Sequence, residues 1–506
     1  MRTLHEAVEA VETYSPSEEQ FNRRRRTVGL VLAPAMLIGV LLAPLPLATA
    51  PHKMAAIISM VMVLWVTEAL PLSATALLGP ALAVILRVAP ARTALAPFAD
   101  PTIFLFIGAF MLAEGMFVHR LDRRIAYTAL SWRFVGTSPG RVLVVYGGVA
   151  TALSMWISNT ATTAMLFPIG MSLIGQMRQP GNARATQGFA MSMMLITAFG
   201  ASIGGMATPV GTPPNLIGIG MLERIGGQRI EFFDWMAFGV PAVIVMFVAL
   251  CAVLYLMGVK GTPVPTGGTG AIREELKKLG PLSIGERNVL IAFGTTIVLW
   301  IAPGLFAIAG LGDSAFARGY AQAMPEGVAA VCGALLLFLL PIDWRTRRST
   351  LTWDEASNID WGIVLLFGGG LALGELAFST GLADALGKGI TAWLPSQSTT
   401  AITILFTGTA IVLSEATSNT AAANMIVPVA IAVAQAAGIR PLEPALGATL
   451  GASMGFMMPV SSPTNAIVYS SGYISITSMM RYGVILDLLG FVVISAIVLL
   501  LGPLLF

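Results

Sequence analysis

The sequence predicts an all-α polytopic membrane protein with eleven transmembrane helices and two re-entrant hairpins, arranged as two inverted-topology repeats. Of the 506 residues, 56% are hydrophobic and only 11% are charged, whereas a soluble domain carries about 25% charged residues. Many apolar runs reach the ~20 residues with which a helix spans a bilayer. A set of polar motifs also occurs twice, in the same order, inside these runs.

The apolar runs define the spans. The predicted spans are 28–48, 54–70, 72–88, 101–118, 187–223, 236–258, 289–310, 325–341, 358–378, 441–478 and 482–504. Two further stretches, 142–177 and 398–437, have a polar break near the middle and are awkwardly long for one helix. We expect each to enter and leave on the same side, because non-helical backbone at that depth is tolerated only where protein or a water-filled cavity covers it.

The basic residues predict the orientation. Eleven spans place the two termini on opposite sides of the membrane. With the N-terminus in the cytoplasm, 21 of the 29 Lys and Arg residues lie on the cytoplasmic side and 8 lie outside. This asymmetry follows the positive-inside rule. We therefore expect a cytoplasmic N-terminus and an outer C-terminus.

The internal repeat is carried by two pairs of motifs. Ser158-Asn159-Thr160 recurs as Ser418-Asn419-Thr420, at an offset of 260 residues. The turn from Gly211 to Asn215 recurs as the turn from Ser461 to Asn465, at an offset of 250. Because the first hairpin opens from the cytoplasm and the second from outside, the repeats are inverted, as in many membrane carriers.

The repeat divides the chain into four parts. These are a cytoplasmic N-terminal tail (1–26), an N-terminal half (27–258) with hairpin 142–177 and broken helix 187–223, a cytoplasmic linker (259–288), and a C-terminal half (289–506) with hairpin 398–437 and broken helix 441–478.

Composition also excludes several classes of protein. The net charge is +3, and the basic residues are scattered along the chain without aromatic residues interleaved among them. No nucleic-acid partner is therefore expected. Cys251 and Cys332 lie in apolar runs, which implies no disulfide framework. The first apolar run follows a tail that is long for a signal peptide, so we expect a retained first helix. The membrane segments show no catalytic triad, metal motif or cofactor loop, so neither an enzyme nor an organic cofactor is expected.

The polar breaks suit an anion together with alkali cations. Residues 142–177 carry no charge and residues 389–439 carry only Glu415, so Lys and Arg are absent. Helix N-termini after each break present free N–H groups and partial positive charge, which suits a carboxylate. Proline frees backbone carbonyls, and with hydroxyl and Asn oxygens these suit an alkali cation. A cation would then offset the charge of the anion.

Glu415 bears on the nature of the coupling ion. A proton carrier needs a titratable group in the membrane, and these segments supply at most Glu415. Sodium coupling is therefore favoured over proton coupling. For Glu415 itself we expect structural hydrogen bonding in the hairpin, with ion coupling as the alternative.

The motifs resemble those of the divalent anion–sodium symporters, the DASS or INDY family, and most closely its bacterial dicarboxylate carriers. The matching stretches are Ser154 to Thr162, Gly211 to Asn215, Ser414 to Thr420, Ser461 to Ser471, and Trp65 to Leu72. The similarity covers about residues 28–504. It implies a homodimer in the bacterial inner membrane that works by an elevator-type alternating-access mechanism.

The resemblance also implies the site residues. Substrate would be bound by Ser158, Asn159, Thr160, Thr212, Pro213, Ser418, Asn419, Thr420, Ser462 and Pro463. One Na+ site would use Ser154, Ser158, Asn159 and Gly211, and the other would use Ser414, Thr417, Asn419 and Ser461. Because Ser461 stands opposite Gly211 in the repeat, a backbone carbonyl is the expected contact there.

Paired Ser-Asn-Thr motifs are most similar to members that carry C4-dicarboxylates such as succinate, malate and fumarate. The function expected is sodium-coupled symport of such a dicarboxylate. A sodium-independent dicarboxylate or tricarboxylate exchanger and a sulfate carrier of the same family are the alternatives within the resemblance. An anion channel is a further alternative class.

Overall fold

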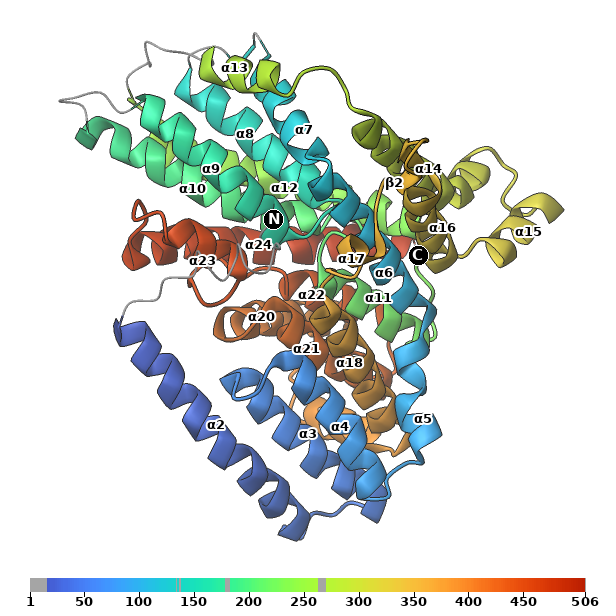
Figure 1. The fold of residues 1–506 in the computed structure, drawn as a ribbon. Coiled ribbons are helices and arrows are strands. Elements are labelled where there is room, and N and C mark those ends of the chain that lie inside the picture. Colours follow the sequence, from blue (N-terminus) through green and yellow to red (C-terminus); the bar gives the residue numbers. More distant parts are fainter. Residues whose placement is uncertain (1–15, 133, 136–137, 178–182, 263–269, 506) are drawn as a thin grey trace.

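The computed structural model describes residues 16–132, 134–135, 138–177, 183–262 and 270–505 (Figure 1). These residues fold into helices joined by short connections, with one short two-stranded antiparallel ribbon. The predicted all-α class is confirmed.

The helices of the N-terminal half follow one another closely along the chain. They are α2 (Pro16–Leu42), α3 (Thr49–Thr67), α4 (Leu72–Ile85), α5 (Ala91–Leu95), the 3₁₀ helix η1 (Ala96–Ala99), α6 (Pro101–Val118), α7 (Leu121–Leu130), α8 (Pro139–Ser154), α9 (Asn159–Met177), α10 (Ala183–Gly205), α11 (Pro213–Arg224), α12 (Phe232–Leu254) and the π-helix η2 (Tyr255–Val259).

The remaining elements begin after the linker. They are α13 (Gly270–Lys278), α14 (Ile284–Ile308), α15 (Ala315–Ala323), α16 (Glu326–Leu339), β1 (Pro341–Asp343), β2 (Arg348–Ser349), α17 (Trp353–Ala356), α18 (Trp361–Ser379), α19 (Leu382–Thr391), α20 (Thr399–Ala416), α21 (Asn419–Ala436), α22 (Leu442–Gly451), α23 (Pro463–Tyr469) and α24 (Ile476–Leu505).

The number of candidate membrane-spanning helices is close to the eleven predicted spans, although the two sets are not the same helices. Within the described residues, ten helices are long and apolar enough to cross a bilayer, or eleven if the bent pair α15 and α16 forms one span. The arms α20 and α21 of the predicted second hairpin are among the ten. Length and composition therefore do not distinguish a re-entrant arm from a span, and the re-entrant hairpins stay a prediction.

The breaks lie where the sequence places them. Residues 155–158 separate α8 from α9, and residues 417–418 separate α20 from α21. The predicted broken helices divide into α10 and α11 and into α22 and α23. At the N-terminus the helix starts at Pro16, so the basic cluster from Arg23 to Arg26 belongs to α2 rather than to a polar tail.

Local sequence signals explain several helix starts. Asp100 accepts a hydrogen bond from the Thr102 amide and precedes Pro101, the first residue of α6. Ser283 and Glu286 form a capping box at the start of α14. In both cases a side chain accepts a hydrogen bond from a backbone amide that has no partner inside the helix.

The elements form three regions in Figure 1. Helices α2 to α5 lie together at the bottom, α8 to α10 and α12 lie at the top, and α20 to α24 lie between them. The helix pair α6 and α16 packs together to one side, and α18 packs against α4. The two predicted hairpins thus belong to packed bundles rather than to peripheral loops.

Candidate functional site

Both Ser-Asn-Thr motifs form helix N-termini. Ser158 precedes α9 and its Oγ accepts a hydrogen bond from the Ala161 amide at 3.2 Å. Ser418 caps α21 in the same way, with the Ala421 amide at 3.2 Å from its Oγ. Each serine is the N-cap that such a position favours. Each motif therefore directs the positive end of a helix dipole towards a break in the chain.

The two Pro/Asn turns start helices as well. Thr212 and Ser462 have extended backbones, with φ of −147° and −150°, and are followed by the first residues of α11 and α23. Neither side chain caps its own helix. The Thr212 hydroxyl lies 3.4 Å from Asn159 Nδ2, and that of Ser462 lies 2.8 Å from Thr464 Oγ1.

Two buried asparagines hold these turns in place. Asn215 Nδ2 donates to the carbonyls of Gly205 at 2.9 Å and Thr208 at 2.7 Å. Asn465 Nδ2 makes the equivalent bonds to Gly455 at 2.9 Å and Met458 at 3.0 Å. Buried carbonyls freed by a helix break need such donors. The repeated turn in the sequence identifies both asparagines. Their role as clamps, each holding two backbone carbonyls, is seen only in the structure.

The two halves of the chain meet around these breaks. Helix α9 packs against α23, and α11 packs against α21 and α22. Ser202 Oγ lies 3.3 Å from Thr464 Oγ1, which joins α10 to α23. A Cβ on Gly218 of α11 would lie 2.1 Å from Thr449 Oγ1 of α22, so this contact requires a glycine. The candidate residues of each half therefore lie beside helices of the other half.

An oxygen-rich group surrounds Asn159. The Asn159 Oδ1 position lies 2.7 Å from Ser154 Oγ, 3.1 Å from the Ala201 carbonyl and 3.3 Å from the Gly211 carbonyl. An amide nitrogen turned to this side would satisfy the carbonyls, and a bound cation would instead favour the oxygen. The group therefore offers four oxygen atoms from three separate segments to an alkali cation.

The second half builds a corresponding group around Asn419. Ser414 Oγ lies 2.8 Å from Asn419 Oδ1 and 2.7 Å from the Ala452 carbonyl, and its single hydrogen can be donated to either. The Thr417 hydroxyl bonds to the Leu413 carbonyl of its own helix at 3.0 Å. The Ser461 hydroxyl donates to the Gly455 carbonyl at 3.1 Å. The side chains of Thr417 and Ser461 are thus used locally, while Ser414 and Asn419 face each other.

The carbonyls of Ala201 and Ala452 were not among the predicted site residues. They occupy corresponding places in the two halves and contact Asn159 and Ser414, respectively. The signal that could have identified them is the repeat itself, because Gly200-Ala201-Ser202 recurs as Gly451-Ala452-Ser453. Backbone ligands leave no side-chain signature, so residue type alone does not reveal them.

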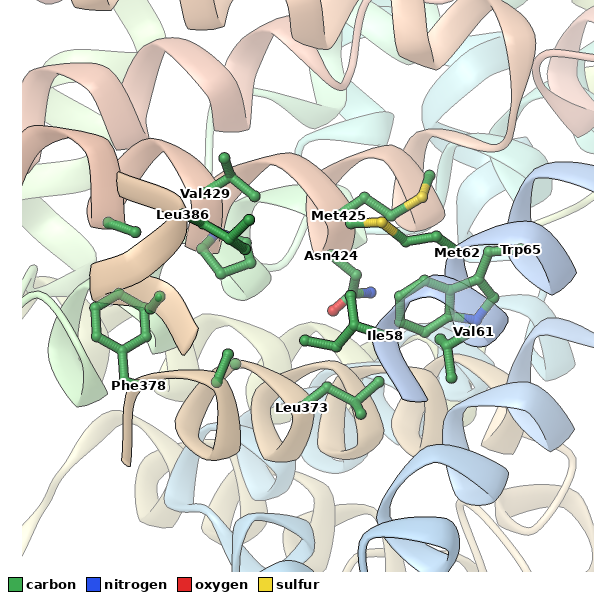
Figure 2. A pocket seen from close by; sticks show the side chains of 15 residues that line it. Ile58, Val61, Met62, Trp65, Leu373, Phe378, Leu386, Asn424, Met425 and Val429 are labelled. Carbon is green, nitrogen blue, oxygen red and sulfur yellow. The ribbon is translucent and has the colours of Figure 1, made fainter. Parts of the chain in front are cut away.

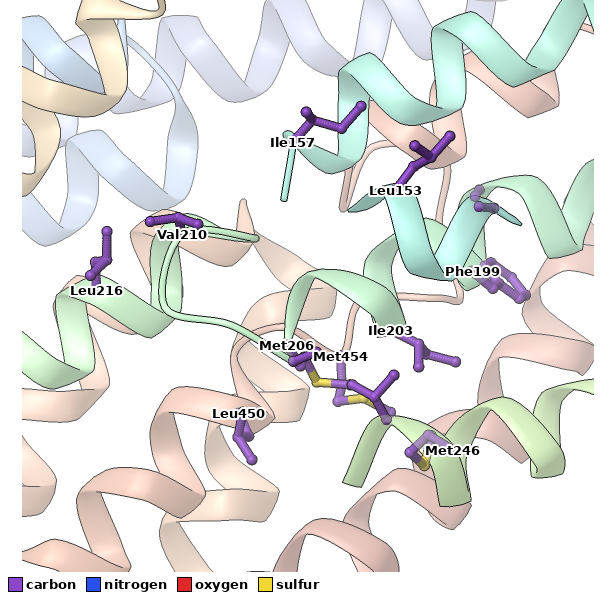
Figure 3. Close-up of a cluster of buried hydrophobic side chains, with 14 of the residues drawn as sticks. Leu153, Ile157, Phe199, Ile203, Met206, Val210, Leu216, Met246, Leu450 and Met454 are labelled. Atoms are coloured by element: carbon purple, nitrogen blue, oxygen red, sulfur yellow. The ribbon is translucent and has the colours of Figure 1, made fainter. Parts of the chain in front are cut away.

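Apolar side chains surround the two breaks of the first half, at residues 155–158 and 206–212. Leu153 precedes Ser154 in the sequence and Ile157 follows it, Ile203 lies near the end of α10, and Met206 and Val210 lie in the break between α10 and α11 (Figure 3). Met454 and Leu450 reach this cluster from the second half. All of them are buried, whereas the residues of both Ser-Asn-Thr motifs are only half-buried. The motifs are therefore the accessible polar part of an otherwise apolar wall.

Of the charged side chains in this region, Glu415 lies beside the breaks of the second half, whereas the ion-paired side chains do not. Among the described residues, the ion pairs of this region are at helix ends, as between Arg224 and Asp100 at 2.7 Å and between Arg440 and Glu443. Glu415 Oε1 accepts hydrogen bonds from the amides of Phe456 and Met457. An anion at the breaks would therefore be held by amides, hydroxyls and helix ends.

Two cavities lie near the candidate site. One, of about 370 Å³, reaches Pro209 of the first break and is bordered by Asp100, Arg224 and Glu326. The other lies between α3, α18, α19 and α21 and is lined by apolar side chains apart from Asn424 (Figure 2). Because it offers a single amide, the second cavity is not suited to an anion, whereas the first has charged side chains along its border and touches the break between α10 and α11 at Pro209.

Comparison with known proteins identifies the family. A sequence profile described as the sodium:sulfate symporter transmembrane region matches residues 24–506. The chain belongs to this family. Its members are transporters rather than enzymes, and the resemblance predicted from the paired motifs is confirmed.

Relatives cover nearly the whole chain. The sodium-dependent dicarboxylate transporter SdcS of Staphylococcus saprophyticus is 33% identical over 484 residues, which is 94% of this chain and 91% of that protein. SdcS of Staphylococcus aureus strain MRSA252 is 32% identical over 487 residues, with 94% and 91% covered.

Solved structures share the fold at low identity. The YdaH transporter of Alcanivorax borkumensis has a TM-score of 0.54 at 14% identity, covering 96% of this chain and 98% of that one. MtrF of Neisseria gonorrhoeae has a TM-score of 0.54 at 10% identity, covering 98% and 96%. At these identities the two structures show that the chain shares their fold.

Proposed function

We propose that this protein takes up a C4-dicarboxylate together with sodium by an elevator-type alternating-access mechanism. The observation that carries the proposal is the oxygen group at Asn159, which a cation would complete and which adjoins a helix N-terminus without any Lys or Arg. Relatives named sodium-dependent dicarboxylate transporters support a dicarboxylate substrate and sodium as the coupling ion.

The dicarboxylate would lie at the two motif pairs. One carboxylate would accept hydrogen bonds from the Ser158-Asn159-Thr160 helix end and the adjoining Thr212-Pro213. The other would meet Ser418-Asn419-Thr420 and Ser462-Pro463. Two helix ends, one from each half, match two separated negative charges, and each supplies amide donors and partial positive charge.

Sodium would bind on the side of each asparagine that faces away from the dicarboxylate. The first site would use Ser154, Ser158, Asn159 and Gly211, with the Ala201 carbonyl as a further ligand that the structure places 3.1 Å from the Asn159 amide. The second would use Ser414, Thr417, Asn419 and Ser461, and since the Thr417 and Ser461 hydroxyls are bonded locally, we expect backbone carbonyls to serve there. Each asparagine would touch both anion and cation.

This arrangement explains coupling. Sodium alone would leave uncompensated positive charge in a low-dielectric wall, and the dicarboxylate alone would leave negative charge. Only the fully occupied or fully empty site would cross the membrane at low cost. We further propose a homodimer in the bacterial inner membrane, with two re-entrant hairpins, two inverted repeats, the N-terminus in the cytoplasm and the C-terminus outside.

Uptake by purified protein in proteoliposomes tests the proposal. Asn159→Ala and Asn419→Ala should each reduce sodium-driven uptake of labelled succinate by at least a hundredfold, because each removes a group shared by anion and cation. Size-exclusion profiles confirm that the variants still fold. Sodium-dependent uptake near the wild-type rate in either variant would show that the site lies elsewhere.

Two alternatives give different results in the same assay. A sodium-independent dicarboxylate or tricarboxylate exchanger would sustain uptake after sodium is replaced by choline, provided that an internal carboxylate is present. The family description also names sulfate, so competition by malate, 2-oxoglutarate, citrate and sulfate separates a sulfate carrier from a dicarboxylate carrier.

A further inference from the structure

Glu415 is a buried carboxylate that the proposed binding of substrate and sodium does not use. It follows Ser414 at the end of α20 and is 8% exposed. Its Oε1 accepts hydrogen bonds from two successive amides, those of Phe456 and, at 2.8 Å, Met457. A buried carboxylate is stable only with strong partners, and here the partners are backbone donors.

The segment that Glu415 binds forms one wall of the second cation site. Phe456 and Met457 lie in the non-helical stretch between α22 and α23. The preceding residue, Gly455, approaches the site closely, since a Cβ there would lie 2.9 Å from Asn419 Oδ1. Asn465 and Ser461 hold the Gly455 carbonyl from the other side. Glu415 therefore fixes this short stretch through the amides of Phe456 and Met457, while Asn465 holds the Gly455 carbonyl.

The first half has no such carboxylate. The offset of 260 residues places Met155 opposite Glu415. There the Thr208 hydroxyl donates to the Met155 backbone carbonyl, a neutral contact. The non-helical stretch is also shorter in the first half, from residue 206 to 212, than in the second half, from 452 to 462. A longer stretch loses more conformational entropy when it is ordered, which accounts for an additional restraint in the second half.

Asp487 of α24 lies beside Glu415. It is 6% exposed, and neither of its carboxyl oxygens has a hydrogen-bond partner among the described residues. Helix α24 presses against the same stretch, because a Cβ on Gly483 would lie 2.6 Å from Met457 Cα. Within the described residues, no ion pair joins either carboxyl to Lys or Arg.

We propose that Glu415, with Asp487 as its neighbour, is a positioning residue for the second sodium site, and that it makes the two sodium sites unequal. It would act through the 455–457 backbone rather than by contact with substrate. Its negative charge beside a low-dielectric site would also favour sodium there. The inference rests on the proposed function, since it assumes that sodium binds near Asn419.

Two measurements on the full-length protein test this inference. The first is the rise in melting temperature with sodium chloride, at constant ionic strength with choline chloride and without substrate. The second is the sodium dependence of succinate uptake. Glu415→Gln keeps an acceptor for the amides but removes the charge, and should raise the half-maximal sodium concentration about tenfold. Glu415→Ala removes both and should raise it further, while the succinate KM at saturating sodium stays within about twofold.

Controls separate positioning from a general loss of stability. Asp487→Asn should reproduce the effect in part, and it remains informative if a Glu415 variant does not fold. Glu68→Gln removes a carboxylate that pairs with Arg25 far from the breaks and should leave the sodium dependence unchanged. A uniformly lower melting temperature with an unchanged sodium response in the Glu415 and Asp487 variants would overturn the positioning role alone. No sodium response in the wild type would overturn the proposed function as well.

Discussion

At the scale of single residues, the two halves differ at one informative pair. Gly211 has no room for a side chain, because a Cβ there would lie 2.5 Å from the Gly205 carbonyl. At the corresponding place, Ser461 fits and its hydroxyl bonds to the Gly455 carbonyl. If the backbone carbonyl is the sodium contact at both positions, the side chain matters only through the space that it takes.

This difference predicts opposite outcomes for two simple substitutions. Gly211→Ala should displace the Gly205 or Gly211 carbonyl and reduce sodium-dependent uptake by at least tenfold. Ser461→Gly removes only a local hydrogen bond and should change uptake by less than about threefold. Sodium activation curves in proteoliposomes measure both. Equal loss in the two variants would mean that the Ser461 hydroxyl itself is a ligand.

At the scale of elements, the sequence predicts the breaks but not what holds them. The paired motifs located the N-termini of α9, α11, α21 and α23, because polar residues and prolines within apolar runs are costly unless the helix is interrupted there and protein or a cavity covers the break. The packing of α9 on α23 and of α11 on α21 was not predictable, since motif spacing reports order along the chain and not contacts across it. Nor were the Ala201 and Ala452 carbonyls, whose role depends on backbone direction.

The asparagine clamps give a prediction at this scale. Asn215→Ala leaves the buried carbonyls of Gly205 and Thr208 without their shared donor. Loss of partners for buried polar groups costs about 1–3 kcal/mol each, so the melting temperature in detergent should fall clearly. The matched control is Thr409→Ala, which removes an exposed hydroxyl bonded within its own helix and should leave the melting temperature unchanged. A fall of equal size in the control would mean that the Asn215 bonds add nothing specific.

At the scale of the whole molecule, one ion-pair group joins elements that alternating access would separate. Arg224 at the end of α11 pairs with Asp100 before α6 at 2.7 Å and with Glu375 of α18 at 3.5 Å. Helix α11 packs on α21 and α22, while α6 packs on α16. The cavity of about 370 Å³ lies between these groups. Movement of the candidate site relative to α6 and α16 would therefore require the Arg224 contacts to break.

A double-mutant cycle on Asp100 and Arg224 tests this link between structure and movement. Arg224 is 40% exposed on its side chain, so solvent weakens the pair and little effect on overall stability is expected. If the pair must open in every cycle, Arg224→Gln and Asp100→Asn should each change the maximal uptake rate severalfold. The double variant should then resemble the single variants, because the second change removes nothing more. The KM for succinate should stay near the wild-type value, since neither residue is proposed to touch substrate. Additive effects of the two substitutions on the uptake rate would show that the two residues act independently, so that opening of their ion pair does not limit transport.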